Sequence, residues 1–287
     1  MKGYSRQTLQ YATLAVFLFI NIFIWSAVAR ADRAGVLTVA FLDVGQGDAI
    51  YIEAPNGNQM LVDGGPPSGA VLRALGSVMP FWDRSLDVVL ATHPDQDHVG
   101  GLPSVLARMR IDNVITTENT SDTGAYAAFE KMIYEKHPTR ILARAGKKII
   151  LDEGVVFEII FPNMNTDGWE TNTASIVARL SYGDQSFIFT GDSPISVEKY
   201  LVGKNGGALH STVLKLGHHG SKTSSSQIFL SAVNPDYAII SAGLNNKYGH
   251  PHKEVIDLLT ELKIPSISTA EQGTVILKTD GTNMQIN

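Results

Sequence analysis

The chain has 287 residues, no cysteine and a formal net charge of −5. Its length suits one large domain or two modest ones, and without cysteine neither a disulfide nor a thiolate metal site can form. Residues 32–287 hold 20 of the 23 basic residues and all 28 acidic ones, a formal charge of −8. This balance excludes a protein that binds nucleic acid through bulk positive charge.

The N-terminal segment predicts a helix for a membrane. Lys2 and Arg6 precede an uncharged apolar stretch, residues 7–29, which at helical rise spans about 35 Å, enough to cross a bilayer. Positive charge before the stretch predicts a cytoplasmic N-terminus and an exported remainder. An Ala-Arg-Ala sequence at its end is typical of a signal cleavage site, so a secreted protein is the alternative. We expect residues 1–31 to be a membrane anchor or signal segment and residues 32–287 an extracytoplasmic domain.

The rest of the chain alternates short apolar strands with helices. Strands are predicted over residues 36–44, 49–52, 60–62, 87–91, 114–116, 140–142, 148–151, 155–161, 175–180, 186–189, 213–216, 237–241, 266–268, 274–278 and 284–286. Helices are predicted over residues 70–78, 102–109, 125–135, 225–232 and 253–262. Helices that follow strand ends in both halves are typical of two packed sheets with helices outside.

The strongest chemical signal is the run His93-Pro94-Asp95-Gln96-Asp97-His98, just after the predicted strand 87–91. Core packing has no use for two imidazoles and two carboxylates, and burying them unpaired would cost several kcal/mol. A bound divalent cation removes that cost. The run therefore predicts a metal site at the strand end, with a solvated polar turn as the alternative.

Other histidines and acids also follow apolar strands. They are Asp63, Asp192, His218, His219, His250 and His252. Loops at one sheet edge are where sites are built. The alternative for Asp63 is a turn-capping aspartate, and for Asp192 it is the end of a hairpin. We interpret the Gly-Gln-Gly turn at residues 45–47 as structural, and Asp43 and Asp48 as acids that hydrogen-bond within that loop.

The order of these motifs resembles the metallo-β-lactamase hydrolase superfamily. More narrowly, it resembles the C-terminal hydrolase domain of ComEC-type DNA-uptake competence proteins. The segments that carry this resemblance are Phe41–Ala49, Leu61–Gly65, His93–Gly101, Phe189–Asp192, Lys215–Ser226 and Tyr248–Pro251. The resemblance implies an α/β fold, a four-layer αββα sandwich with a metal cleft at the sheet edges, preceded here by one N-terminal transmembrane or signal helix.

The resemblance also implies residue roles. It assigns one complete metal site to Asp97, His98, Asp192 and one of His218 and His219. We favour His219, which directly precedes Gly220. The implied nucleophile is a metal-bound hydroxide that Asp97 orients, while Asp63 supports the ligands rather than binding metal.

A second, weaker site would combine Asp192 with His93 and Asp95. Asp95 stands where the family has a histidine, and the histidine expected before the strand 175–180 is missing, so Asn172 would help instead. Carboxylate and amide ligands shift the preference from zinc toward manganese or magnesium. We expect one or two divalent ions, manganese or zinc, with magnesium as a further option.

Two further groups could contact an anion. Pro251 suits the first turn of the predicted helix 253–262, which would place His250 at a helix start as a transition-state donor or accessory ligand. Ser221 and Lys222 precede the predicted helix 225–232 and could contact phosphate or cap that helix.

The expected function is a metal-dependent phosphodiesterase, a nuclease that acts on DNA outside the cytoplasm. One alternative is a hydrolase of a small ester, lactone or phosphodiester, and another is a non-catalytic metal-binding scaffold. A single apolar segment cannot conduct DNA, so any role in uptake is expected to need a channel partner. The basic residues at 140, 144, 147 and 148 are expected to form a solvated face.

Overall fold

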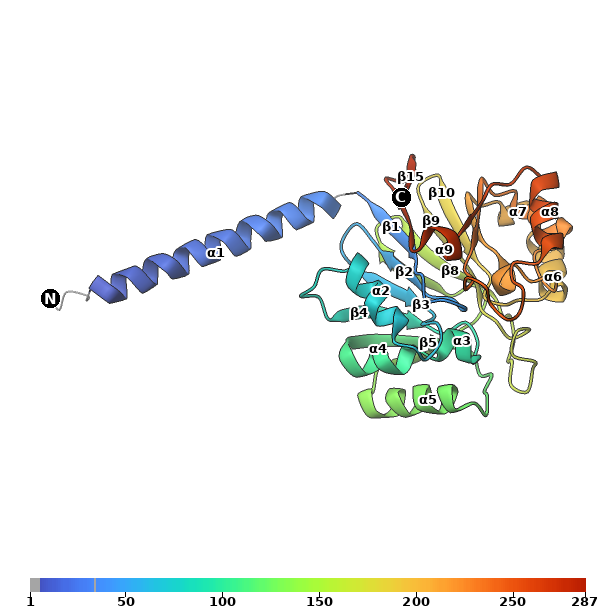
Figure 1. The fold of residues 1–287 in the computed structure, drawn as a ribbon, viewed down its shortest axis with the longest axis horizontal. Helices are drawn as coiled ribbons and strands as arrows, with labels where there is room; N and C mark the ends of the chain where they lie inside the picture. Colours follow the sequence, from blue (N-terminus) through green and yellow to red (C-terminus); the bar gives the residue numbers. More distant parts are fainter. Residues whose placement is uncertain (1–5, 34) are drawn as a thin grey trace.

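The structure, a computed structural model, describes residues 6–33 and 35–287, so Lys2 lies outside it. The N-terminal stretch forms one long helix, α1 (Arg6–Arg33), which continues past the predicted end. Its segment Arg6–Trp25 is long and apolar enough to cross a membrane, and none of it is buried. Figure 1 shows α1 projecting away from the domain. An exposed apolar segment of this length is consistent with membrane anchoring.

Every strand predicted from the sequence is present, and the strands form two sheets. The first sheet runs β15 (Met284–Ile286), β14 (Val275–Thr279), β1 (Leu37–Phe41), β2 (Ile50–Glu53), β3 (Gln59–Val62), β4 (Ser85–Leu90), β5 (Arg110–Thr116) and β6 (Thr139–Leu142). The second runs β13 (Ser266–Ser268), β12 (Tyr237–Ile240), β11 (Val213–Lys215), β10 (Gln185–Phe189), β9 (Val177–Tyr182), β8 (Val155–Phe161) and β7 (Lys148–Asp152).

The two sheets pack face to face through apolar side chains of their alternating strands. Phe41 of the first sheet meets Phe157 and Phe189 of the second within one buried cluster. The rings of Phe157 and Phe189 stack with centroids 5.8 Å apart. Burying aromatic rings of this size is a main source of core stability.

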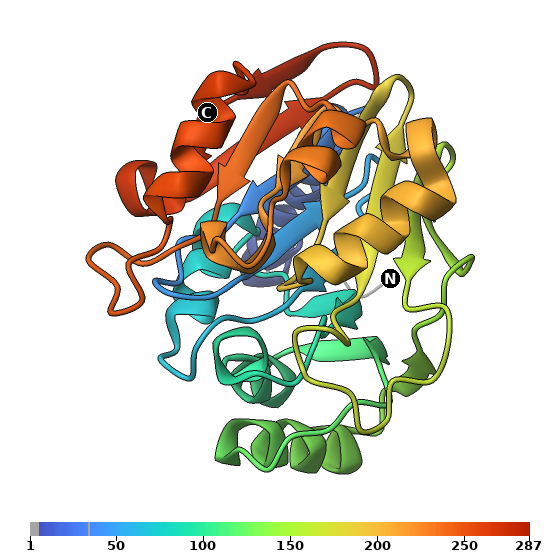
Figure 2. The same cartoon turned by 90° about the vertical axis from the view of Figure 1, so that its right-hand side faces the viewer.

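Helices cover both outer faces. The first sheet carries α2 (Ala70–Val78), α4 (Leu102–Arg108) and α5 (Gly124–Lys136). The second carries α6 (Ile195–Asn205), α7 (Gln227–Val233) and α8 (Lys253–Glu261), which lie in front of its strands in Figure 2. Shorter helical pieces are α3 (Gln96–Val99), α9 (Thr269–Gln272) and two 3₁₀ turns, Gly206–Leu209 and Gly217–Gly220. The four-layer αββα sandwich is therefore confirmed.

Helix α6 was not predicted from the sequence. Its buried face contains Glu198 between Val197 and Leu201, and an acid inside the apolar stripe hides the helical pattern. Glu198 is buried because its carboxylate accepts the backbone N–H groups of Ser225 and Ser226, at 2.5 and 2.8 Å. Glu198 therefore stabilises the turn that leads into the neighbouring helix α7.

The strand directions bring the loops that carry the candidate site residues to one edge of each sheet. In the first sheet β3, β4 and β5 are parallel, and in the second β10, β11 and β12 are parallel. Carboxyl ends of parallel strands share an edge, so the loops after β3, β4, β10 and β11 meet where the two sheets meet.

Candidate metal centre

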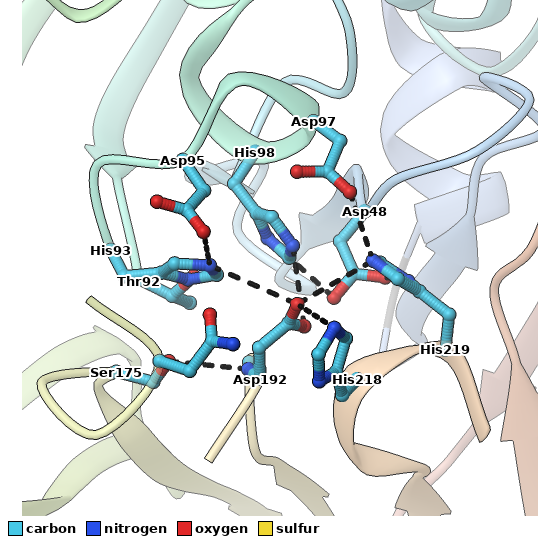
Figure 3. A network of polar contacts seen from close by, with 12 residues as sticks. Asp48, Thr92, His93, Asp95, Asp97, His98, Ser175, Asp192, His218 and His219 are labelled. Carbon is cyan, nitrogen blue, oxygen red and sulfur yellow. Dashed lines mark hydrogen bonds and ion pairs between the residues drawn. The ribbon is translucent and has the colours of Figure 1, made fainter. Parts of the chain in front are cut away.

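Four buried side chains converge where these loops meet. Asp48, His98, Asp192 and His219 each offer a ligand atom, and these atoms all lie within 4.8 Å of one another. The Nε2 atoms of His98 and His219 lie 3.2 and 3.6 Å from the two carboxylate oxygens of Asp192. Figure 3 shows Asp192 at the centre of the group.

Several polar atoms of this group are buried without a hydrogen-bond partner. They include Nε2 of His98 and His219 and Oδ1 of Asp192, and Nε2 of the neighbouring His93 is buried in the same way. Each such atom costs about 1–3 kcal/mol when it stays unpaired. Nitrogen and carboxylate oxygen are suitable ligands for zinc or manganese. The donor set therefore fits a divalent cation.

His98 is held from behind by Asp63. Its Nδ1 lies 2.8 Å from Asp63 Oδ2, and the same carboxylate accepts the N–H and the hydroxyl of Thr92 at 2.8 and 2.7 Å. A carboxylate that accepts from Nδ1–H fixes the imidazole so that Nε2 faces the group. Asp63 thus lies behind a histidine, outside the four-residue group.

Asp48 performs a similar task for His219, and our sequence interpretation of its side chain was wrong. Asp48 Oδ1 lies 3.3 Å from His219 Nδ1, which also donates to the Ser241 carbonyl at 2.9 Å. The other oxygen of Asp48 forms an ion pair with the buried amine of Lys215. By contrast, Asp43 does hydrogen-bond within the loop, since its Oδ1 accepts the Gly45 N–H at 3.1 Å.

A sequence signal for Asp48 existed in its partner. Lys215 stands between Leu214 and Leu216 at the end of an apolar strand, and all three residues are buried. A lysine is almost never fully buried unless it is paired. A lysine within this apolar strand therefore predicts a buried acidic partner elsewhere in the chain, but it does not identify that acid.

The charges of the group stabilise one another in the metal-free protein. Burial would raise the pKa of Asp192, but His98 and His219 hold it well below its usual range. Burial likewise opposes ionisation of Asp48, yet Lys215 and His219 lower its pKa to about 2. In return, Asp192 and Asp48 outweigh burial and raise the pKa of His219 to about 9. Asp192 and Asp63 similarly raise the pKa of His98.

We expect the metal-free protein to lose stability between pH 6.5 and about 9. A histidine with a raised pKa stabilises the fold fully below its ordinary value of 6.5 and loses that contribution as the pH rises to its folded value. Metal requires the neutral imidazole, so metal affinity should increase over the same window. Both expectations are checked by measuring the melting temperatures of the metal-free and the manganese-loaded chain at pH 6.5 and at pH 9. A metal-free melting temperature that does not fall would contradict the expectation, and His219→Gln should flatten the change.

A second, looser position lies beside the first. His93 Nε2 is 3.7 Å from Asp95 Oδ2 and 3.9 Å from Asp192 Oδ2, and burial lowers the pKa of His93 to about 3. A neutral imidazole is the form that binds metal. The Asp95 side chain also hydrogen-bonds Thr171. The residue after Thr171 in the sequence is Asn172, and its Oδ1 is buried without a hydrogen-bond partner.

Asp97 reaches the group from α3. Its Oδ2 lies 3.3 Å from His219 Nε2, and a third of its side chain is exposed. Burial opposes ionisation, but His219 and His98 lower the pKa of Asp97. The Asp97 carbonyl packs against the Gly-Gln-Gly turn, where a Cβ on Gly47 would lie 2.1 Å from that oxygen at φ +131°. The turn is therefore structural, as predicted.

His218 and His219 occupy a tight turn after β11. Both have left-handed backbones, with φ of 49° and 57°, which cost about 1–3 kcal/mol each and cluster at functional sites. The turn points His219 into the group, whereas His218 stays partly exposed with Nε2 3.6 Å from Asp192. Sequence order alone left these two histidines unresolved.

His250 lies at the rim, but not at a helix start as predicted. Helix α8 begins at Lys253, and its N-cap is His252. Pro251 packs on Gly220, where an added Cβ would lie 2.7 Å from it, and the His252 N–H donates to the Gly220 carbonyl at 2.9 Å. These contacts hold the segment outside the helix. The His250 ring lies 5.4 Å from that of His218 and 6.2 Å from that of His219.

Ser221 and Lys222 do not cap the following helix. Helix α7 begins at Gln227, two residues after the predicted start. The backbone N–H groups of the two residues just before it, Ser225 and Ser226, donate to the carboxylate of Glu198. Negative charge already fills that position, so an anion is disfavoured there. Ser221 instead hydrogen-bonds Thr223 at 3.0 Å, and Lys222 is exposed 3.9 Å from Glu254.

Comparison with known proteins agrees with this architecture. Residues 42–243 match the profile of the Metallo-beta-lactamase superfamily. The chain is 33% identical over 241 residues to Competence protein ComA of Neisseria gonorrhoeae, covering 84% of this chain and 32% of ComA. It is 29% identical over 255 residues to ComE operon protein 3 of Bacillus subtilis (strain 168), covering 83% and 32%. The chain thus spans about a third of the length of these relatives.

Solved structures agree in fold. Igni18, a metallo hydrolase of Ignicoccus hospitalis KIN4/I, superposes with a TM-score of 0.56 at 14% identity, covering 84% of this chain and 98% of Igni18. The profile match covers more than half of the chain. This chain belongs to the metallo-β-lactamase superfamily.

Proposed function

We propose that this chain, a metal-dependent hydrolase by family and by site, is a phosphodiesterase that cleaves DNA. The observation that carries the proposal is the donor set, in which Asp97 and Asp192 accompany His219 while Asp95 accompanies His93 beside them. Carboxylate-rich ligands favour manganese or magnesium, the ions suited to phosphoryl chemistry. The relatives named for competence support DNA as the substrate.

The first metal position would be held by His98, His219, Asp192 and Asp97, because Lys215 and His219 Nδ1 already engage the carboxylate of Asp48. A second position would be held by His93, Asp95 and Asp192. A divalent cation bound there lowers the pKa of water and neutralises phosphoryl charge. Asp63 and Asp48 hold the two imidazoles so that both Nε2 atoms point inward. Asp97, exposed on the open side, can orient the attacking water.

His250 is suited to donate a hydrogen bond to the leaving oxygen. Burial and the neighbouring histidines lower its pKa to about 4, so its ring is neutral near pH 7 and carries one N–H. The Asn246 side chain holds the loop in place. Its Oδ1 accepts the backbone N–H of His250 at 3.0 Å, and its amide donates to the backbone carbonyl of His250 at 2.5 Å. His250 Nδ1 is buried without a hydrogen-bond partner.

Asp97→Ala is expected to abolish turnover while the fold stays largely intact, because a ligand is lost at a partly exposed position. The test incubates the full chain in detergent with labelled single- and double-stranded DNA and titrates manganese, magnesium and zinc. Metal-dependent cleavage that disappears in Asp97→Ala supports the proposal and identifies the metal. Full activity in the variant would refute the metal assignment.

His250→Ala is expected to lower turnover by roughly 10²–10³-fold, the usual contribution of a hydrogen-bond donor that stabilises transition-state charge, with metal content unchanged. Loss of metal would instead make His250 a ligand. Cleavage rate and bound metal are measured together, and His210→Ala, at an exposed loop histidine, is the matched control. Unchanged turnover in His250→Ala would exclude both roles.

A small phosphodiester, ester or lactone is the second candidate substrate, favoured by surface charge. Three residues of the basic cluster predicted to be solvated are paired with acids, Arg140 with Glu130, Arg144 with Glu118, and Lys148 with Glu158. Little free positive charge remains there for a polyanion. Hydrolysis of bis-p-nitrophenyl phosphate, without DNA cleavage by a folded and metal-loaded chain, would favour this candidate.

We further propose that α1 anchors the chain in a membrane, with the domain outside the cytoplasm and a separate channel partner in any DNA uptake. The apolar window Arg6–Trp25 supports the anchor, and the competence relatives support the partner. Protease applied to intact cells should digest the domain. Full protection would contradict this orientation.

A further inference from the structure

An aromatic pair stands exposed in the loop between α2 and β4. Phe81 and Trp82 have 78% and 64% of their surface open to solvent, and their rings form an edge-to-face pair with centroids 4.9 Å apart. Each side chain can bury about 150–250 Å². An exposed apolar patch of this kind usually marks an interaction surface.

The aromatic pair lies at the domain edge where α1 enters. Strand β1 is antiparallel to β2, β2 is antiparallel to β3, and β3 is parallel to β4. The starts of β1, β3 and β4 therefore share one edge, with β1 and β4 roughly 15 Å apart. Gln59, at the start of β3, donates to Asp83 Oδ2 at 2.9 Å and holds the loop there. In Figure 1 this loop and α1 leave the domain on the same side.

The chain connection keeps this edge close to any membrane that holds α1. The apolar window ends at Trp25 and the helix at Arg33, which adds about 12 Å at helical rise. Only residues 34–36 separate Arg33 from the start of β1 at Leu37, a reach of at most ~14 Å between the flanking Cα atoms. The metal-capable group follows the opposite ends of β3 and β4, away from this edge.

Two unpaired arginines accompany the aromatic pair. Arg84 and Arg108 are exposed, and within the described part of the chain neither has an acid at ion-pair distance. The nearby carboxylates of Asp83 and Asp87 are occupied, since both accept hydrogen bonds from Gln59. Both arginines line a cavity of about 570 Å³ between α2 and α4, together with Leu72, Met79 and Met109. A guanidinium at such a place suits a phosphate group.

We propose that this edge, the docking edge formed by Phe81, Trp82, Arg84 and Arg108, rests on the surface of the membrane that holds α1. Aromatic rings favour the bilayer interface, and arginines are attracted to anionic lipid. The inference rests on the anchoring by α1 proposed above. It fixes the orientation of the domain, so that the metal-capable group opens away from the lipid toward water.

The absence of native cysteine makes single-cysteine labelling a clean test. The full chain is reconstituted in vesicles of phosphatidylcholine and phosphatidylglycerol that carry a nitroxide lipid, with a fluorescent label at Phe81→Cys. The label is expected to lose at least about half its fluorescence, because interfacial side chains enter ~5–10 Å into the headgroup region. A label at Tyr248→Cys, beside His250 at the opposite edge, is the matched control and should lose little.

A label within α1 and a double arginine variant complete the test. A label at Leu14→Cys in α1 reports whether the anchor is inserted. Quenching at position 14, with position 81 quenched no more than 248, would refute the docking edge and leave the anchor intact. No quenching at position 14 would refute the anchor and this inference with it. Arg84→Glu combined with Arg108→Glu should at least halve the quenching at position 81, and undiminished quenching would remove the arginines from the proposal.

Discussion

Asp192→Asn is expected to lower metal-dependent hydrolysis by more than about 10²-fold and to remove bound metal. Residues that merely support a ligand cost about 10–100-fold when changed, and Asp192 faces His98 and His219 directly. It also faces His93 and His218 at 3.9 and 3.6 Å. Asparagine keeps the shape but removes the charge that both metal positions would share. Metal content and cleavage rate of the purified full chain are measured together.

Two matched variants show whether this loss is specific to the site. Asp63→Asn removes the carboxylate behind His98 and should cost less, about 10–100-fold in metal affinity. Asp184→Asn, at the exposed hairpin turn between β9 and β10, should change neither metal content nor rate. If Asp192→Asn retains metal and wild-type turnover, Asp192 is not a ligand.

Lys215→Met is expected to destabilise the fold by about 3–5 kcal/mol, because it breaks the buried ion pair of Lys215 with Asp48 and leaves that carboxylate without its lysine partner. Both side chains are almost fully buried, so water cannot replace the lost charge. Lys215 also donates to the Gly191 carbonyl at 3.3 Å, next to Asp192. Denaturant unfolding of the metal-free chain, followed by circular dichroism, measures the loss.

The double variant Asp48→Asn with Lys215→Met separates stability from activity. Removing both charges of a buried pair is often close to neutral for stability, so most of the lost stability should return. Activity should stay low, since a neutral amide no longer holds the Nδ1 side of His219 as the carboxylate does. A single variant as stable as the native chain would show that the pair does not matter for folding.

The strands were predictable because their signal is local. Short apolar runs bounded by glycine, proline or charge gave every strand, and helix α2 began and ended at the predicted residues 70 and 78. Helix α6 was not predicted because the buried Glu198 interrupts its apolar stripe. Glu198 accepts a backbone N–H just before α7, and the local sequence pattern holds no sign of this contact between distant segments.

The candidate site was predictable only in part, for the same physical reason. The compact run from His93 to His98 is a local motif, and its meaning can be inferred from residue types alone. Asp48 was missed because its partner Lys215 lies far away in the sequence, and a buried ion pair becomes visible only when the two sheets meet. Pro251 was misplaced because its packing on Gly220 likewise joins two distant loops.

A divalent cation is expected to bind between His98, His219 and Asp192. Crystals of the chain soaked in manganese, measured at a wavelength where manganese scatters anomalously, test it most directly. We predict an anomalous peak within bonding distance of His98 Nε2, His219 Nε2 and an Asp192 oxygen, and no such peak in Asp192→Asn crystals. A well-folded native crystal without a peak at this position would show that no metal binds there.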